Sequence, residues 1–244
     1  MQLSWAPRAR PLLSYLATLA WAFAAFMAGQ VTALAVLVWW SGGNLRAVYA
    51  NPYDGAVVTV SVFVLNPVII AVLMFSVWLK GASQIEYLGL VWPKTRLVTV
   101  GIGGIVLIIA ATDALLFVSG HAIVSSFQVV SYTTAAAEGW LPLMLIATIL
   151  VAPAGEEIMY RGFLFRGFVR SERSAWPAIV VISLLWAGPH LQYDLTGIAE
   201  IFVAGLFLGW VRWRSGSTLL TLLLHGLFNL EGTIETVVQV KHVF

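Results

Sequence analysis

The stretch from Leu141 to Phe168 reads LPLMLIATILVAPAGEEIMYRGFLFRGF, and it places the charged residues Glu156, Glu157 and Arg161 inside a long apolar run. A hydrocarbon core of about 30 Å takes about 20 helical residues to cross, so this run is long enough. Charged side chains at that depth are expensive and usually serve a function. The stretch therefore predicts a membrane-spanning helix that carries a polar site.

The rest of the chain has the composition of an integral membrane protein. Of its 244 residues, 60% are apolar and 10% are charged, and the mean hydropathy is +0.92. The alternating polarity of β-barrel strands does not occur. We predict an all-α fold, a polytopic transmembrane helical bundle. The expected spans are residues 12–40, 56–79, 97–118, 140–168, 176–193, 198–213 and 218–240.

The number of spans is seven or eight, depending on residues 120–139. This moderately apolar interval is either a re-entrant or surface segment or one further span. Repeats, low-complexity tracts and linkers are not visible in the sequence. We therefore expect one membrane domain, residues 1–244, in which N-terminal helices (1–138) precede a core (139–240).

The positive charges predict the orientation of the bundle. Cytoplasmic connections are enriched in Lys and Arg. An N-terminus in the cytoplasm, at the cell (inner) membrane, leaves Arg46 and Lys241 outside. The cations then inside are Arg8, Arg10, Lys80, Lys94, Arg96, Arg161, Arg166, Arg170, Arg173, Arg212 and Arg214. Membrane topology explains this small excess of cations better than nucleic-acid binding does, so no nucleic-acid partner is expected. The chain has no cysteine, which excludes thiol catalysis and disulfides.

The two glutamates differ in their expected partners. Glu157 and Arg161 are four residues apart in the favourable acid-before-base order, so they can pair along one helix face. Glu156 is rotated by about 100° and has no partner on its own helix, which leaves it free to act on another molecule. The preceding Pro153-Ala154-Gly155 predicts a break, with a new helical segment starting at the glutamates. A charge network that only joins two helices is the alternative.

His190 lies near the end of the next predicted span, 176–193. Arg173 lies in the cationic turn, and His190 follows it by 17 residues. Glu156 precedes Arg173 by the same number of residues. Both would be about 25 Å along antiparallel helices from that turn, and so at one depth. Alternatively, His190 is an interfacial residue at the end of its span.

The last span carries one polar face in a background of Leu and Val. Its members are spaced three or four residues apart. We expect His225 and Asn229 to reach the depth of Glu156, although an interhelical hydrogen-bond seam would have the same pattern. The face consists of Thr218, Thr221, His225, Asn229 and Gly232.

These three groups of residues together predict a hydrolase of acyl or peptide bonds. A glutamate and a histidine at one depth can hold and deprotonate a water molecule. A second histidine and an asparagine can donate hydrogen bonds to a developing oxyanion.

The same residues resemble the ordered motifs of a known family. These are Glu156-Glu157-xxx-Arg161, an aromatic-xxx-His element from Trp186 to His190, and His225-xxx-Asn229. They are similar to those of the CAAX protease and bacteriocin-processing (CPBP or ABI) family of intramembrane glutamic endopeptidases. The resemblance covers roughly residues 140–235.

The resemblance implies a role for each of these residues. Glu156 would be the general base on the water, assisted by His190. His225 and Asn229 would form the oxyanion hole, and Glu157 with Arg161 would support the site. The family usually has Phe where this chain has Trp186, so the wall of the substrate cavity would be bulkier here.

The resemblance also implies a peptide or lipidated protein as substrate, delivered through membrane lipid, and chemistry without a metal or cofactor. Sequence signatures of zinc, serine and aspartyl intramembrane proteases are missing. A zinc site built from Glu156, His190 and His225 remains an alternative. So do a non-catalytic scaffold or bacteriocin self-immunity protein and, less favoured, a small-solute transporter.

Overall fold

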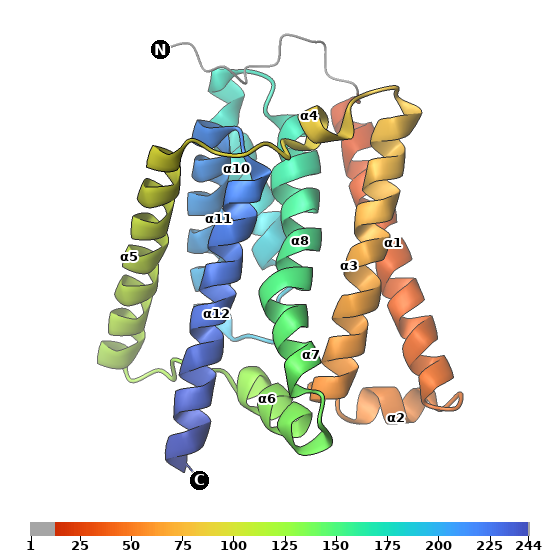
Figure 1. Ribbon diagram of the computed structural model, residues 1–244, viewed down its shortest axis with the longest axis vertical. Coiled ribbons are helices and arrows are strands. Elements are labelled where there is room, and N and C mark those ends of the chain that lie inside the picture. Colours follow the sequence, from red (N-terminus) through yellow and green to blue (C-terminus); the bar gives the residue numbers. More distant parts are fainter. Residues whose placement is uncertain (1–12, 244) are drawn as a thin grey trace.

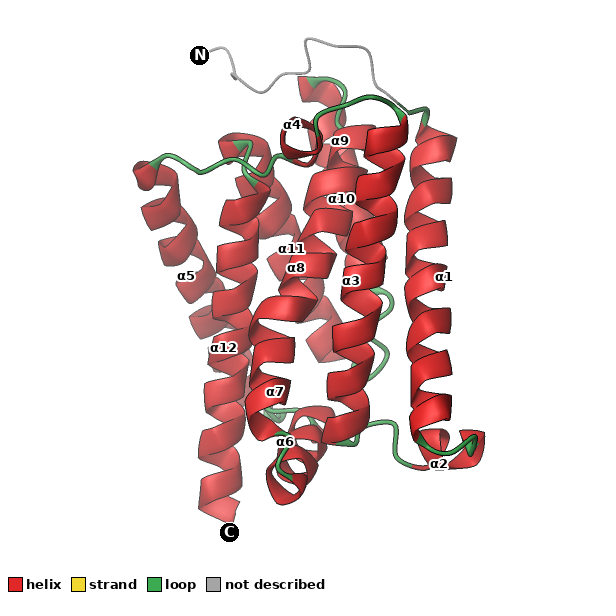
Figure 2. Ribbon diagram, turned by 45° about the vertical axis from the view of Figure 1, so that its right-hand side comes forward, coloured by secondary structure: helices red, strands yellow, loops and turns green. Residues whose placement is uncertain are grey.

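The computed structural model describes residues 13–243, which form a bundle of helices (Figure 1). Over these residues the chain contains no strand (Figure 2). The predicted all-α membrane bundle is confirmed. Three features of the sequence prediction, Arg8, Arg10 and the first residue of the first span, lie outside the described residues.

The long helices follow the expected spans closely. They are α1 (Tyr15–Trp40), α3 (Gly55–Leu79), α5 (Thr95–Ser119), the composite helix Leu141–Phe168, α10 (Glu172–Ala187), α11 (Leu195–Ser215) and α12 (Thr218–Val243). Shorter helices connect them: α2 (Leu45–Ala50), α4 (Gln84–Leu88) and α6 (Ser126–Glu138).

Five of the long helices in the described part are long and apolar enough to cross a membrane. These are α1, α3, α5, the composite helix and α11. Helix α10 has only 16 residues, and α12 is long enough but carries polar side chains such as Glu231 and Glu235. The protein is thus an integral membrane protein, while a count of seven or eight spans stays a prediction.

Helix α10 is shorter than the span expected at 176–193. It ends at Ala187, and Gly188 and Pro189 follow. Pro189 has no N–H to donate to the Leu185 carbonyl, which accepts from the Tyr160 hydroxyl at 3.3 Å instead, so the helical hydrogen bonds end there. The remaining residues of the expected span form the turn that leads to α11.

Helix α6 lies at the end of the bundle opposite α4 and is inclined to the long helices (Figures 1 and 2). Its 13 residues extend about 20 Å, which is less than a hydrocarbon core requires. The Ser131 hydroxyl donates to the Tyr53 carbonyl at 2.8 Å, and the Gly55 amide donates to the Thr134 hydroxyl at 2.7 Å. Helix α6 is therefore bonded to the start of α3 and is by itself too short for a span, as expected for the re-entrant or surface alternative.

The predicted break at Pro153 is wrong, because the helix continues through it. Proline has no N–H, and π-helical turns leave some amides without their usual partner, so the two are compatible. Glu156 and Glu157 accordingly lie at the end of one α-helical segment within this continuous helix, and not at the start of a new helix. The composite helix consists of α7 (Leu141–Ile146), π-helical η1 (Ala147–Val151), α8 (Ala152–Glu157), π-helical η2 (Ile158–Leu164) and α9 (Phe165–Phe168).

Small residues bring α11 against α10. A side chain at Gly209 would meet Ile179 at 2.7 Å, and one at Gly205 would meet Ser183 at 3.0 Å. At the same end of the bundle as α4, the Thr218 hydroxyl donates to the Leu88 carbonyl at 2.6 Å and so fixes the start of α12. These contacts position three of the helices that surround the glutamates.

Candidate functional site

Glu157 and Arg161 form the predicted pair, deep inside the bundle. Their side chains are 0% and 1% exposed, and Arg161 Nη1 donates to Glu157 Oε1 at 2.8 Å. His225 Nδ1 lies 2.9 Å from the same oxygen. Buried charges need such partners. Glu157 therefore joins the composite helix to α12 and fixes the His225 ring.

Arg161 makes further contacts with two other helices. Its guanidinium lies over the Trp186 ring of α10, 4.1 Å from the ring centroid. Its Nη2 donates to the Gly205 carbonyl of α11 at 3.5 Å. In addition, Arg212 Nε donates to the Arg161 carbonyl at 2.8 Å. Arg161 thus connects the composite helix to α10 and α11.

Glu156 points to a different side of the helix from Glu157, as its sequence position predicts. Trp186 Nε1 of α10 donates to its Oε2 at 2.5 Å, and His225 Nε2 lies 4.0 Å from that oxygen. Sequence reasoning placed Trp186 in the wall of the substrate cavity, but missed its hydrogen bond to Glu156. The presence of an indole where the family usually has Phe was the available signal.

His190 lies in the turn after α10. Its Nδ1 is 2.8 Å from the Trp186 carbonyl oxygen, and the two ring centroids are 5.8 Å apart. His190 and Glu156 line the same two cavities. The structure therefore brings both residues of the second motif to Glu156, and the Trp186 ring lies beside the His190 ring.

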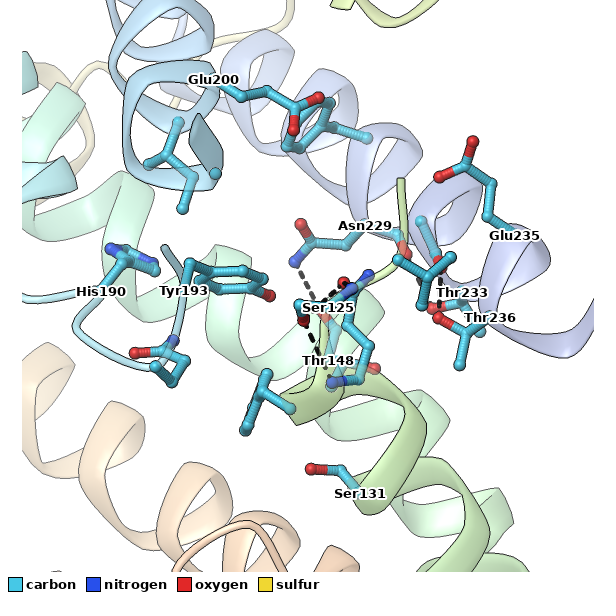
Figure 3. Close-up of a pocket in the computed structure, with 18 of the residues that line it drawn as sticks. Ser125, Ser131, Thr148, His190, Tyr193, Glu200, Asn229, Thr233, Glu235 and Thr236 are labelled. Atoms are coloured by element: carbon cyan, nitrogen blue, oxygen red, sulfur yellow. Dashed lines mark hydrogen bonds between the residues drawn. The ribbon is translucent and has the colours of Figure 1, made fainter. Parts of the chain in front are cut away.

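Asn229 approaches the composite helix from α12 (Figure 3). Its Nδ2 donates to the Thr148 carbonyl at 2.7 Å, within the π-helical segment η1. A side chain at Gly226 would meet the Ile149 carbonyl at 2.9 Å, so the two helices are in close contact here. An amide nitrogen carries two hydrogens, and the second remains for another acceptor.

Two cavities meet at Glu156. The larger has a volume of about 440 Å³, and its lining includes Glu156, His190, His225 and Asn229 (Figure 3). The smaller, of about 170 Å³, is lined mainly by apolar side chains of α1, α3 and η2. Among the described residues that line these cavities, Glu157 and Arg161 do not appear, so they support the site without facing the cavities.

Gly155 lets α3 come close to the glutamates. A side chain on Gly155 would overlap the Asn66 amide, with only 2.7 Å between the added carbon and Asn66 Cβ. Asn66 is 2% exposed and lines the smaller cavity together with Glu156. The residue before Glu156 therefore has to be a glycine, and α3 forms one wall of the site.

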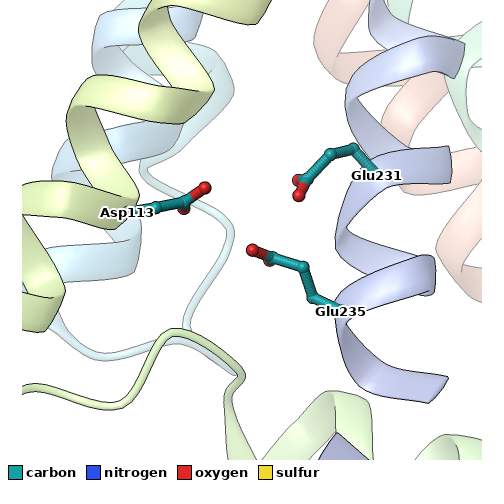
Figure 4. A group of neighbouring side chains, drawn as sticks. All are labelled: Asp113, Glu231 and Glu235. Atoms are coloured by element: carbon teal, nitrogen blue, oxygen red, sulfur yellow. The ribbon is translucent and has the colours of Figure 1, made fainter. Parts of the chain in front are cut away.

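The far part of the larger cavity is acidic. Asp113 of α5 and Glu231 and Glu235 of α12 converge there, with one ligand atom of each within 4.8 Å of the others (Figure 4). Glu200 lines the same cavity and accepts from the Thr112 hydroxyl at 2.9 Å. The sequence analysis did not single out Glu231 and Glu235, although their spacing of four residues places them on one helix face.

The alternative zinc ligands do not form such a cluster. Within residues 13–243, the group of three ligating side chains that meets the 4.8 Å limit is the acidic one, and Glu156, His190 and His225 do not make another. Instead, His225 uses Nδ1 to bind Glu157, while its Nε2 faces Glu156.

Comparison with known proteins supports the reading of the motifs. Residues 138–230 match a family model described as type II CAAX prenyl endopeptidase Rce1-like. Over 86 residues the chain is 38% identical to an Escherichia coli protein described as an uncharacterized 24.3 kDa protein. That alignment covers 34% of this chain and 39% of the relative, so the chain matches about two fifths of the relative's length. No solved structure matches the chain. The resemblance to the CAAX protease and bacteriocin-processing family is therefore confirmed for residues 138–230.

Proposed function

We propose that the protein is an intramembrane endopeptidase that uses Glu156 to activate a water molecule, without a metal or cofactor. The observation that carries this proposal is the position of Glu156. Its carboxylate faces two cavities inside a membrane bundle, 4.0 Å from His225, within a segment that matches a family of CAAX endopeptidases. The reaction is hydrolysis of a peptide bond.

In the proposed mechanism, Glu156 takes a proton from water while the water oxygen attacks the carbonyl carbon. His190, on the lining of the same cavities, helps to hold that water. The second Asn229 N–H and His225 donate to the tetrahedral oxyanion. The C–N bond then breaks, and the proton on Glu156 passes to the leaving amine. Glu157 accepts from His225 Nδ1 and fixes the ring, so donation from Nε2 to the oxyanion requires the imidazolium form, in which both nitrogens carry a proton.

The proposed substrate is a membrane-delivered peptide or protein. A CAAX-like lipidated protein and other membrane-anchored peptides share the requirement for a site that opens inside lipid. The lining of the smaller cavity is mostly apolar, and the lining of the larger one combines apolar with polar side chains, which suits a substrate with both kinds of side chain.

The proposed orientation has the N-terminus in the cytoplasm. The α3–α4, α9–α10 and α11–α12 connections lie at one end of the bundle (Figure 1). That end carries most of the cations of the described chain. They include Lys80, Lys94, Arg170, Arg173 and Arg214. The enrichment of cytoplasmic connections in Lys and Arg supports this assignment.

Asn229→Ala tests the oxyanion role. An oxyanion donor stabilises the transition state more than the bound substrate, so its loss should lower kcat by about 10²-fold and leave KM nearly unchanged. Rate against substrate concentration would be measured with a fluorogenic peptide in nanodiscs, alongside thermal unfolding. Thr233→Val, on the same face of α12 and in the same cavity, is the control. An unchanged kcat with a raised KM would make Asn229 a substrate-binding residue instead.

Treatment with a chelator tests the absence of a metal from the mechanism. Dialysis of the active protein against a strong chelator should leave kcat/KM unchanged, and metal analysis should find well under one equivalent. A loss of activity that added zinc restores would move the mechanism to metal-activated water. The control is the same preparation dialysed without chelator.

A further inference from the structure

We propose that Trp186 is a positioning residue for Glu156, and that its indole N–H holds the carboxylate in one orientation. This inference rests on the proposed function of Glu156 as the base. Trp186 is 2% exposed, and its Nε1 donates to Glu156 Oε2 at 2.5 Å. Hydrogen bonds to an ionised acceptor are shorter and stronger than neutral ones.

The indole is held firmly by the residues around it. Arg161 lies over its face at 4.1 Å, and the His225 ring centroid is 5.1 Å away at an interplanar angle of 78°. A side chain at Gly205 would meet the Trp186 ring at 3.1 Å, so α11 closes a further side. Because the ring cannot turn, the N–H has a fixed direction. Oε2 of Glu156 is therefore occupied, and Oε1 is left to accept a proton from water.

A phenylalanine, which the family resemblance expects at this position, fills similar space but carries no donor. The wall of the cavity and the contact with Arg161 need only an aromatic face. The hydrogen bond to Glu156 needs the indole nitrogen. Trp186→Phe therefore separates the positioning role from the packing role.

Several other ionisable groups face Glu156, and the substitution leaves each of them in place. His225 of α12 lies 4.0 Å from the carboxylate, and His190 shares both cavities with it. Tyr160 of η2 and Tyr193 of the α10–α11 turn are close enough to interact with its charge. Arg161 lies over the face of the Trp186 ring, 4.1 Å from its centroid. A change in kcat in Trp186→Phe would thus report the lost N–H.

The hydrogen bond can be observed without any activity measurement. In protein labelled with ¹⁵N-tryptophan in detergent, Trp186→Phe and Trp213→Phe each remove one indole signal and so assign it. Trp213 Nε1 is a matched reference, since it is buried without a partner in the described structure. The Trp186 indole proton should resonate downfield of the Trp213 proton. Glu156→Gln replaces the carboxylate acceptor by a neutral amide and should move the Trp186 signal towards that of Trp213.

The kinetic effect follows from the same bond. Without the donor the Glu156 carboxylate is free to rotate away from the water, so kcat of Trp186→Phe should fall by about 10-fold while KM stays nearly unchanged. Thermal stability should change little, and Trp213→Phe should retain the normal kcat and KM.

Two results would overturn the proposal. One is a Trp186 indole signal that coincides with that of Trp213 and is unchanged by Glu156→Gln. The other is a Trp186→Phe protein with the same kcat as the unsubstituted protein. If the unsubstituted protein cleaves no peptide, the proposed function fails, and the indole signal still decides whether Trp186 holds Glu156.

Discussion

Glu156→Gln should reduce peptide hydrolysis by at least about 10³-fold, because an amide cannot take a proton from water, and a general base typically contributes about 10² to 10⁴. Glutamine has nearly the same shape, and its amide oxygen can still accept the hydrogen bond from Trp186. The folded yield should therefore be almost unchanged. The measurement is the single-turnover rate on a fluorogenic peptide in nanodiscs.

The control for this prediction is Glu138→Gln, at the exposed end of α6. It makes the same chemical change away from both cavities and should keep the full rate. Full peptidase activity in purified Glu156→Gln protein would refute the base assignment. A cellular function that survives Glu156→Ala would favour a non-catalytic scaffold or immunity protein, whereas movement of a solute into sealed vesicles would favour a transporter.

Arg161→Ala should destabilise the protein by about 3 to 5 kcal/mol, because it leaves the Glu157 carboxylate buried without its cation. The loss should be visible as a lower folded yield and as a lower midpoint of thermal unfolding in detergent. Activity should fall as well, since Arg161 also supports the Trp186 ring and joins α11.

A double variant distinguishes this cause from lost packing. Replacing both partners, as in Glu157→Gln with Arg161→Met, removes the uncompensated charge and should recover part of the stability. Arg214→Ala, at an exposed position in the last turn of α11, is the surface control and should change the unfolding midpoint little. If the double variant is less stable than Arg161→Ala, the attraction within the ion pair contributes more to the free energy of unfolding than the desolvation of its two charges removes.

Sequence reasoning could predict the helices because hydropathy and length determine them directly. The span expected at 56–79 is α3 (Gly55–Leu79), and the one expected at 218–240 is α12 (Thr218–Val243). The Glu157–Arg161 pair was equally accessible, since helical spacing alone brings the two side chains together.

Other features depend on contacts between distant residues and have no local signal. The helix around Pro153 continues because π-helical turns are compatible with proline, while the sequence shows only a helix breaker. Asn229 binds a carbonyl of that distorted region, 81 residues away. The bond between Trp186 and Glu156 likewise depends on how α10 packs against the composite helix.

The fit of Asn66 against Gly155 has a consequence for experiments on fragments and chimaeras. Residues 138–230 carry the three motifs, but α3, which lies outside this range, forms one wall beside Glu156. Expressing that segment without α3 would expose the apolar side of the smaller cavity to lipid and leave the glutamate helix without its neighbour. If the segment is joined to the N-terminal helices of another protein, the surroundings of Glu156 are preserved only if the helix that replaces α3 packs equally closely against Gly155.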